Sequence, residues 1–179
     1  MILTGQQIAG DVAAGRITID PYTPDGVEPN SYRFHLADQM ICYDHEAVDC
    51  ATPPAVTQQR IGPEGIVVEP GRVYLGATIE TMGSRHYAAT LYGRRSVATL
   101  GVWIQFSAPL GHAGAVIPWT LEITAAQPVR LYAGMPIGKI AFWVMAGRPL
   151  EYAGRYHGSV GAVASRMSHG WRLAHGDRS

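Results

Sequence analysis

Gly93-Arg94-Arg95-Ser96-Val97-Ala98-Thr99-Leu100-Gly101 is the stretch of this sequence that says most about its fold and function. A glycine turn that opens a short helix with two arginines and a serine offers backbone N–H groups, guanidinium forks and a hydroxyl, which suit a polyphosphate. Glu122 follows 21 residues after Gly101, inside an otherwise apolar segment at residues 119–123. A carboxylate in such surroundings needs a partner or a chemical role. The sequence therefore predicts a phosphate-binding turn and a functional carboxylate at a fixed separation.

Size and charge narrow the classes of function. At 179 residues with 47% hydrophobic content, and with no repeat or linker, the chain is expected to form a single domain over residues 1–179. Its formal net charge is zero and its pI is about 7.1, so there is no electrostatic basis for binding nucleic acid or an anionic membrane. No apolar run is long enough to cross a bilayer and no signal-peptide pattern opens the chain, so we expect a cytoplasmic protein.

Local patterns predict a chain made mostly of short strands. Thr4 and Gln7 have the spacing of a capping box and predict a short helix that stops at Gly15. The chain then carries many short segments rich in Val, Ile, Tyr and Thr, separated by glycines and prolines. The expected strands cover residues 31–36, 66–68, 73–78, 102–106, 115–123 and 137–144. This density predicts an all-β barrel or sandwich, with an irregular surface excursion over residues 44–65 and a loosely attached tail over residues 167–179.

The spacing of the two motifs resembles that of the dCTP deaminase branch of the dCTP deaminase/dUTPase family, where Gly-Arg-Ser-Ser-x-Ala-Arg-x-Gly precedes a strand and Leu-Glu. Four other segments are similar to this family in the same order: the opening helix, the strand start after it, the penultimate hairpin and a nucleotide-covering tail. They lie at residues 1–17, 27–32, 132–142 and 155–166. The resemblance implies a distorted β-barrel of the dUTPase-like type, with a short N-terminal helix and a short helix after the Gly-Arg-Arg-Ser turn.

The activity implied by this resemblance is zinc-independent hydrolytic deamination of a cytosine nucleotide, most simply dCTP to dUTP and ammonia. Water must attack C4 of the base, and a carboxylate beside C4 can take the water proton, so Glu122 is the expected catalytic residue. Many other deaminases hold zinc through Pro-Cys-x-x-Cys, which this sequence lacks. Cys42 and Cys50 are too few for such a site, while a disulfide between them stays open. The structural alternative for Glu122 is an exposed position on a strand face.

The resemblance also implies a set of substrate-binding residues. They are Arg94, Arg95, Ser96, Thr99, His112, Thr120, Leu121, Tyr152, Arg155 and Ser159. Arg94 and Ser96 match phosphate-contacting positions, and Tyr152 and Arg155 match tail positions that close over sugar and phosphates. Mg²⁺ is expected to accompany the phosphates, with no metal bound for catalysis.

Several departures from the family pattern fall in this expected pocket. Arg95 stands where the family has its first Ser, and Thr99 where it has an Arg near the base and the catalytic Glu. His112 stands where the family has an Asp that faces the deoxyribose 3′-OH, and Arg33 replaces an acidic residue. The pattern predicts a divergent member with an altered substrate or reduced activity. A dUTPase-like nucleotide diphosphatase is disfavoured by His112, whereas a catalytically silent nucleotide-binding homologue is favoured by Thr99.

The assembly implied by the resemblance is a homotrimer with active sites at subunit interfaces. The Gly-Arg-Arg-Ser segment of one subunit is expected to face the Glu122 strand of its neighbour. Residues 102–106 and 115–119 are almost continuously apolar, and one barrel would bury only one face of each strand, so their other face favours burial between subunits. A monomer with that face covered by residues 44–65 is the alternative.

Overall fold

The computed structural model describes residues 1–44, 47–105 and 107–175, and most of its regular structure is strand. The strands are β1 (Thr18–Asp20), β2 (Val27–Glu28), β3 (Ser31–Tyr43), β4 (Val56–Arg60), β5 (Ile66–Val68), β6 (Tyr74–Gly83), β7 (Ala88–Gly93), β8 (Val102–Trp103), β9 (Leu110–Gly111), β10 (Ile117–Ala125), β11 (Val129–Leu131) and β12 (Pro136–Trp143). The helices are α1 (Gly5–Ala13), α2 (Arg95–Ala98) and α3 (Met167–His175), with a 3-10 turn at Pro24–Gly26. The all-β class and both short helices are confirmed.

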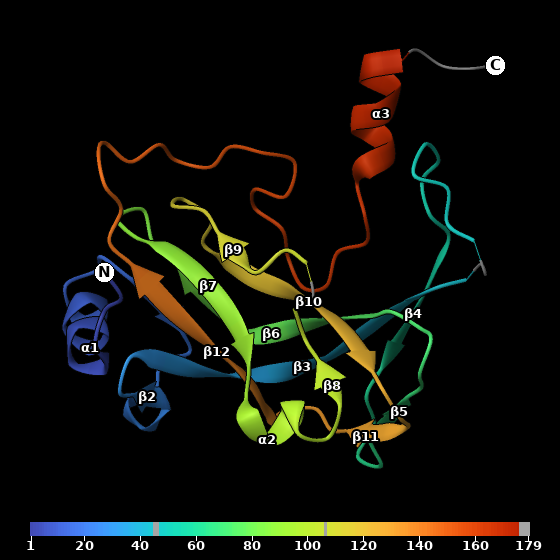
Figure 1. The fold of residues 1–179 in the computed structure, drawn as a ribbon, viewed down its shortest axis with the longest axis horizontal. Helices are drawn as coiled ribbons and strands as arrows, with labels where there is room; N and C mark the ends of the chain where they lie inside the picture. Colours follow the sequence, from blue (N-terminus) through green and yellow to red (C-terminus); the bar gives the residue numbers. More distant parts are fainter. Residues whose placement is uncertain (45–46, 106, 176–179) are drawn as a thin grey trace.

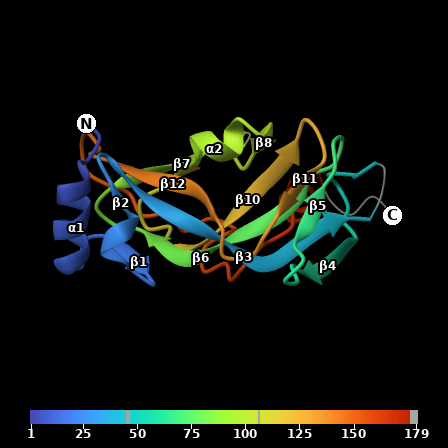
Figure 2. The same cartoon turned by 90° about the horizontal axis from the view of Figure 1, so that it is seen from below.

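An antiparallel sheet curls through the molecule as a half-barrel (Figure 1). Its main path runs β8-β10-β6-β3-β12-β7-β9; β1 also pairs with β6, and β2 and β4 pair with β3. β5 and β11 form a separate two-stranded sheet. Figure 2 shows α1 at one end of the sheet and β4 and β5 at the other. β10 thus lies in the sheet between β8 and β6, where it can carry Glu122 on a rigid support.

Alternation along β10 decides which side of the sheet Glu122 faces. Leu121, Ile123 and Ala125 are buried in the main hydrophobic core. Because successive side chains of a strand point to opposite faces, Thr120, Glu122 and Thr124 lie on the other face and are only half-buried. The core therefore fixes the strand that presents the carboxylate.

The N-terminal helix forms as its capping pattern predicts. The Thr4 side chain accepts a hydrogen bond from the backbone N–H of Gln7 at 3.2 Å, and Gly15 follows the helix with a φ of 70°. Ile8 is fully buried beneath it. The Gln7 side chain does not return to the cap, however, but donates to Asp11 Oδ1 at 2.9 Å.

Two predicted segments have more structure than expected. The strand predicted at residues 31–36 continues to Tyr43, and its far half gives β4 a partner, with Tyr43 opposite Val56 and Gln39 opposite Arg60. The prediction of an irregular excursion over residues 44–65 is therefore wrong for Val56–Arg60. This strand is largely exposed and polar, so it lacks the apolar alternation that reveals a strand in sequence.

The C-terminal segment also differs from the expected loose tail, because residues 167–175 form helix α3. Its nine residues include Gly170, which weakens any helical pattern read from sequence. In the other direction, the strand predicted over residues 102–106 is confirmed only for Val102–Trp103, and Phe106 lies outside the described residues. Cys42 and Cys50 are free thiols. Within the described residues, no helix has the length and apolarity needed to span a membrane.

A buried carboxylate ties α1 to the rest of the fold and predicts acid sensitivity. The Asp11 side chain is fully buried, and it accepts hydrogen bonds from Gln7 and from Arg16 Nε, both at 2.9 Å. Burial acts to raise the pKa of Asp11, but hydrogen bonds from Tyr87, Arg16 and Gln7 outweigh it and hold that pKa below its usual range. Ionised Asp11 thus contributes its full stabilisation at pH values above its pKa in the unfolded chain, about 4. This stabilisation is lost as the pH falls through the lower pKa that Asp11 has in the folded protein.

We expect Asp11→Asn to lower the free energy of unfolding at pH 7 by about 1.5–3 kcal/mol, the value of hydrogen bonds to a charged group. Urea unfolding at several pH values from 7 down to about 3 measures the difference in free energy of unfolding between wild type and variant. Asp25→Asn is the control, because Asp25 is exposed. The gap between wild type and Asp11→Asn should narrow towards the acid end. A gap that stays constant with pH would refute the proposed linkage.

Candidate functional site

The outward face of β10 and β6 forms the floor of a cavity of about 610 Å³. Glu122 stands on β10 opposite Leu75 of β6, and both line this cavity together with Thr120, Thr124 and Val73. The floor is therefore mainly apolar with one carboxylate, which is the setting expected for a group that acts on a bound molecule.

The Glu122 carboxylate is held from one side by the loop that follows β8. The backbone N–H of Ser107 donates to Glu122 Oε2 at 3.2 Å. In the same loop, Gln105 Nε2 donates to the carbonyl of Ala108 at 2.8 Å, and all three loop residues line the cavity. One carboxylate oxygen is thus oriented by the backbone, which leaves Oε1 to face a ligand.

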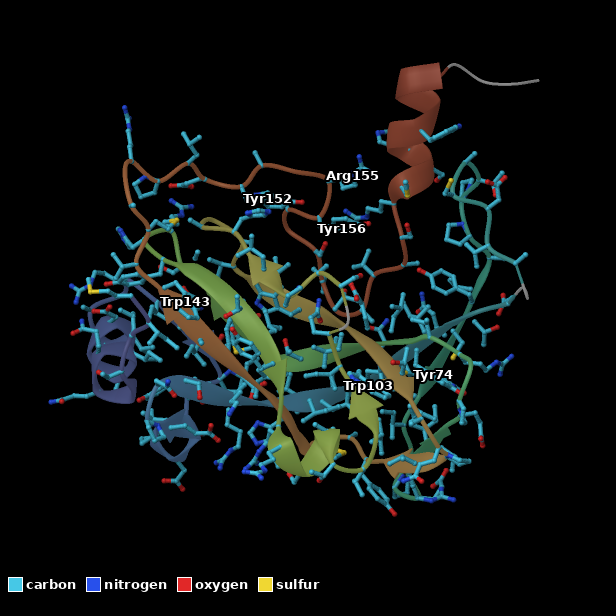
Figure 3. All side chains as sticks on the ribbon, in the orientation of Figure 1. Tyr74, Trp103, Trp143, Tyr152, Arg155 and Tyr156 are labelled. Atoms are coloured by element: carbon cyan, nitrogen blue, oxygen red, sulfur yellow. The ribbon has the colours of Figure 1, made fainter. Side chains whose placement is uncertain are left out.

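The segment between β12 and α3 forms the roof of the cavity, and Figure 3 shows Tyr152, Arg155 and Tyr156 along it. Tyr152, Tyr156, Ser159, Val163 and Ser165 line the cavity from above. Backbone hydrogen bonds fasten this roof to the sheet: Val163 N–H donates to Thr120 Oγ1 at 3.0 Å, and Ser165 N–H donates to the Tyr43 hydroxyl at 3.2 Å. The roof segment therefore contacts the floor directly.

His112 and Tyr152 join the floor to the roof. Their rings stack with centroids 5.5 Å apart and planes 15° apart, and both residues line the cavity. The backbone N–H of Tyr152 also donates to the carbonyl of Ala113 at 2.7 Å. His112, predicted to bind substrate, thus lines the cavity and stacks on a roof tyrosine.

Two of the predicted residues line neither this cavity nor the second pocket described below. The Leu121 side chain is fully buried in the core, because it lies on the opposite face of β10 from Glu122, so only its backbone is near the cavity floor. Arg155 Nη1 donates to the carbonyl of Arg166 at 3.2 Å, and Arg155 is not among the residues lining the cavity. Ser159 is in the cavity, with its hydroxyl donating to the carbonyl of Tyr156 at 2.7 Å.

The residues predicted to hold phosphate gather at a second pocket, of about 450 Å³, around α2. Its lining consists of Arg94, Arg95, Ser96, Thr99, Lys139 and Glu28. Arg94 occupies the N-cap position of α2, and its side chain makes no capping hydrogen bond. Ser96 is the second residue of the helix and lines the pocket. Lys139 comes from β12, and β12 pairs with β7, the strand that leads into α2.

The short helix places Arg95 and Thr99 on one face of this pocket. The two residues are four positions apart, and the backbone N–H of Thr99 donates to the carbonyl of Arg95 at 2.9 Å, which closes one helical turn. Side chains at this spacing are neighbours on a helix surface.

Within one chain the two pockets are separate. They share no lining residue, and no Arg or Lys is among the described residues that line the Glu122 cavity. In Figure 1, α2 lies at the bottom of the view, whereas the roof segment between β12 and α3 runs along the top. One chain thus offers a carboxylate cavity without cations and a cationic pocket without that carboxylate. In the part of the chain that the structure describes, no three or more His, Cys, Asp or Glu side chains group as a metal site.

Sequence reasoning missed several lining residues. Tyr43, which lines the Glu122 cavity, lies at the end of β3, beyond the predicted strand. Lys139, which lines the pocket at α2, lies in a predicted strand, where the alternation of buried residues marks it only as half-buried. Glu28 belongs to a segment interpreted only as a strand start. Their nearness to the site depends on strand pairing between distant segments, which no local pattern reveals.

The chain is thus an all-β half-barrel with a covered carboxylate cavity and a separate arginine-rich pocket. A family model described as dCTP deaminase-like matches residues 2–145. A dCTP deaminase of Rhodopirellula baltica is 36% identical over 93% of this chain and 84% of the relative. A protein of Clostridium acetobutylicum named "dCTP deaminase, dUMP-forming" is 37% identical over 93% of this chain and 96% of the relative.

A solved structure of a 2′-deoxycytidine 5′-triphosphate deaminase from Agrobacterium tumefaciens has the same fold, with a TM-score of 0.64 and 19% sequence identity. The similarity covers 80% of this chain and 48% of that longer chain. This similarity confirms the predicted fold, and the family model and the relatives confirm the predicted family. The chain belongs to the dCTP deaminase-like family, which consists of enzymes of nucleotide metabolism.

Proposed function

We propose that this protein hydrolytically deaminates the cytosine of a deoxycytidine nucleotide, most simply dCTP, without a catalytic zinc ion. The observation that carries the proposal is Glu122, a half-buried carboxylate on the floor of a covered cavity with one oxygen held by the Ser107 N–H. Relatives at 36% and 37% identity bear the name dCTP deaminase, which supports the same substrate class here.

The chemistry needs one residue that both accepts and donates a proton. Glu122 takes a proton from water while the water oxygen bonds to C4 of cytosine. The same carboxyl group then delivers this proton to N3. Glu122 then carries the proton of the new C4 hydroxyl to the amino group, which leaves as ammonia, and C4 becomes a carbonyl. The balance is one nucleotide and one water consumed, with one uracil nucleotide and one ammonia released.

We further propose that each active site is completed by a second copy of the chain in a homotrimer. The Glu122 cavity contributes no Arg or Lys among its described lining residues, yet a triphosphate carries several negative charges. The arginine pocket at α2 of a neighbouring subunit would supply that charge. Trp103 on β8 and Leu110 on β9 expose 47% and 55% of their surface to solvent. Such large exposed apolar side chains favour burial between subunits.

Incubation with dCTP, followed by separate quantification of ammonia, dUTP, dUMP and pyrophosphate, tests the proposed reaction. Ammonia with dUTP in equal amounts is expected from deamination alone. Ammonia with dUMP and pyrophosphate would indicate a second hydrolysis, as named for the Clostridium acetobutylicum relative. Nucleotide binding without ammonia would leave a silent nucleotide-binding protein and refute the proposal. The zinc content of the active protein is measured in parallel, and stoichiometric zinc would contradict the zinc-independent route.

Arg94→Ala is expected to weaken triphosphate binding by about 1.5–3 kcal/mol, roughly tenfold to a hundredfold, the range of a charge-assisted contact. Binding of the nucleoside deoxycytidine should change little, because it carries no phosphate. Calorimetry with both ligands measures the difference, and Arg130→Ala is the matched control, since Arg130 lies on β11 away from both pockets. Equal losses for both ligands would show that Arg94 supports the fold or the base.

A further inference from the structure

The pocket around α2 contains a carboxylate among its cations. Glu28 lines it beside Arg94, Arg95 and Lys139. The described ion pairs are Arg16–Asp11, His35–Glu80, Arg60–Asp38 and Arg85–Glu151, so Glu28 is not paired with any of these three neighbours. A carboxylate left unpaired beside three cations needs a reason, because it opposes the binding of a bare polyphosphate.

The backbone fixes Glu28 at this place. Glu28 is opposite Ser31 in the tight β2–β3 pairing, and the Ser31 hydroxyl donates to Glu28 Oε2 at 3.1 Å. Arg33 follows two residues after Ser31 and is opposite Lys139 of β12, so Ser31, Arg33 and Lys139 share one face of the sheet. The Ser31 hydroxyl therefore orients the Glu28 carboxylate through Oε2, at the edge of a positively charged surface. The other oxygen, Oε1, remains for a ligand.

We propose that Glu28 binds the Mg²⁺ ion that accompanies the nucleotide phosphates, through one of the ion's coordinated waters or directly. Mg²⁺ prefers oxygen ligands and is commonly held by one or two carboxylates together with substrate phosphates, while it keeps several waters. The donors of this pocket fit such an ion: one oriented carboxylate, with the hydroxyls of Ser96 and Thr99 beside it. Bound Mg²⁺ would turn the repulsion between Glu28 and the phosphates into attraction.

This inference rests on the proposed phosphate role of the pocket, and it goes further by assigning the residue that makes binding depend on Mg²⁺. The cations alone would favour the free phosphate chain, because it carries more negative charge than its Mg²⁺ complex. With Glu28 among them, the pocket should favour the Mg²⁺ complex and disfavour the free chain.

Calorimetry of inorganic tripolyphosphate, with Mg²⁺ or with EDTA, tests the assignment without using the base or the deamination reaction. In wild type, Mg²⁺ should tighten binding. Glu28→Gln keeps an acceptor for Ser31 and should reduce this Mg²⁺-dependent gain by roughly tenfold, as for the loss of one charge-assisted contact. The same variant should bind tripolyphosphate more tightly than wild type in EDTA, because the repulsion is gone.

The exposed Glu69→Gln variant serves as the control and should behave as wild type in both conditions. An unchanged Mg²⁺ gain in Glu28→Gln would overturn the assignment. Equal weakening with and without Mg²⁺ would also overturn it, because that result marks a structural role. Failure of wild type to bind tripolyphosphate in either condition would overturn it together with the phosphate role of the pocket. A protein that binds as expected but releases no ammonia from dCTP would refute the proposed reaction alone.

Discussion

Glu122→Gln is expected to slow ammonia release from dCTP by about 10²–10⁴-fold, the range that general acid–base groups contribute. The amide keeps the size of the side chain and can still be held in the cavity by the Ser107 N–H through its oxygen. It cannot accept the proton of the attacking water. Single-turnover measurement of ammonia at saturating dCTP follows this step directly.

Binding separates this catalytic effect from a structural one. We expect the Kd for dCTP to change less than about threefold in Glu122→Gln, because the proposed role of this residue lies in proton transfer. Glu69→Gln, an exposed carboxylate on the same chain, is the control for general effects of removing a negative charge. Turnover of the Gln variant at the wild-type rate would remove Glu122 from the mechanism.

The sequence was a good guide wherever local chemistry decides structure. The Thr4 cap, the Gly15 stop and the turn into α2 all follow from residues within a few positions of one another. Alternation in β10 likewise places Leu121 and Ile123 in the core. The same alternation turns the Leu121 side chain into the core, so the predicted substrate contact of this residue would have to come from its backbone.

Elements that depend on distant partners were harder to predict. β4 is polar and exposed, and it is a strand because the extended half of β3 is there to pair with it. Tyr43 enters the cavity lining for the same reason. Glu28 joins the cationic pocket only because the β2–β3 pairing brings it near Lys139 and α2. Neither residue has a neighbour in sequence that marks a functional site.

The departures at Arg95 and Thr99 also look different once the helix is in view. A loss of positive charge at position 99 predicts a weakened site. Because Arg95 and Thr99 are one turn apart on α2, the positive charge stays on the same helix face and moves by one turn. The measurement of ammonia release decides between an active enzyme and the catalytically silent alternative.

Mixed oligomers are expected to recover activity that neither parent variant has. Glu122→Gln removes the proposed base, and the double variant Arg94→Ala/Arg95→Ala removes two cations of the α2 pocket. If each site takes Glu122 from one subunit and the arginines from its neighbour, some sites in a mixture contain both intact halves. In a head-to-tail ring of three subunits that contains both variants, about a third of the sites combine one intact half from each variant.

Co-expression of the two variants with different affinity tags, followed by sequential purification on both tags, isolates the mixed oligomers. Each variant expressed alone, carried through the same purification, gives the background rate. Light scattering coupled to gel filtration confirms that the purified species has about three times the 19.3 kDa chain mass, as expected for a closed three-fold ring.

The rate of ammonia release from dCTP by these mixed oligomers is the most direct measurement of the central claim, that Glu122 and the α2 arginines of different subunits form one active site. At subsaturating dCTP we predict about a third of the wild-type rate per chain, far above either parent. A rate no higher than that of the parent variants, in oligomers shown to contain both chains, would contradict a site shared between subunits.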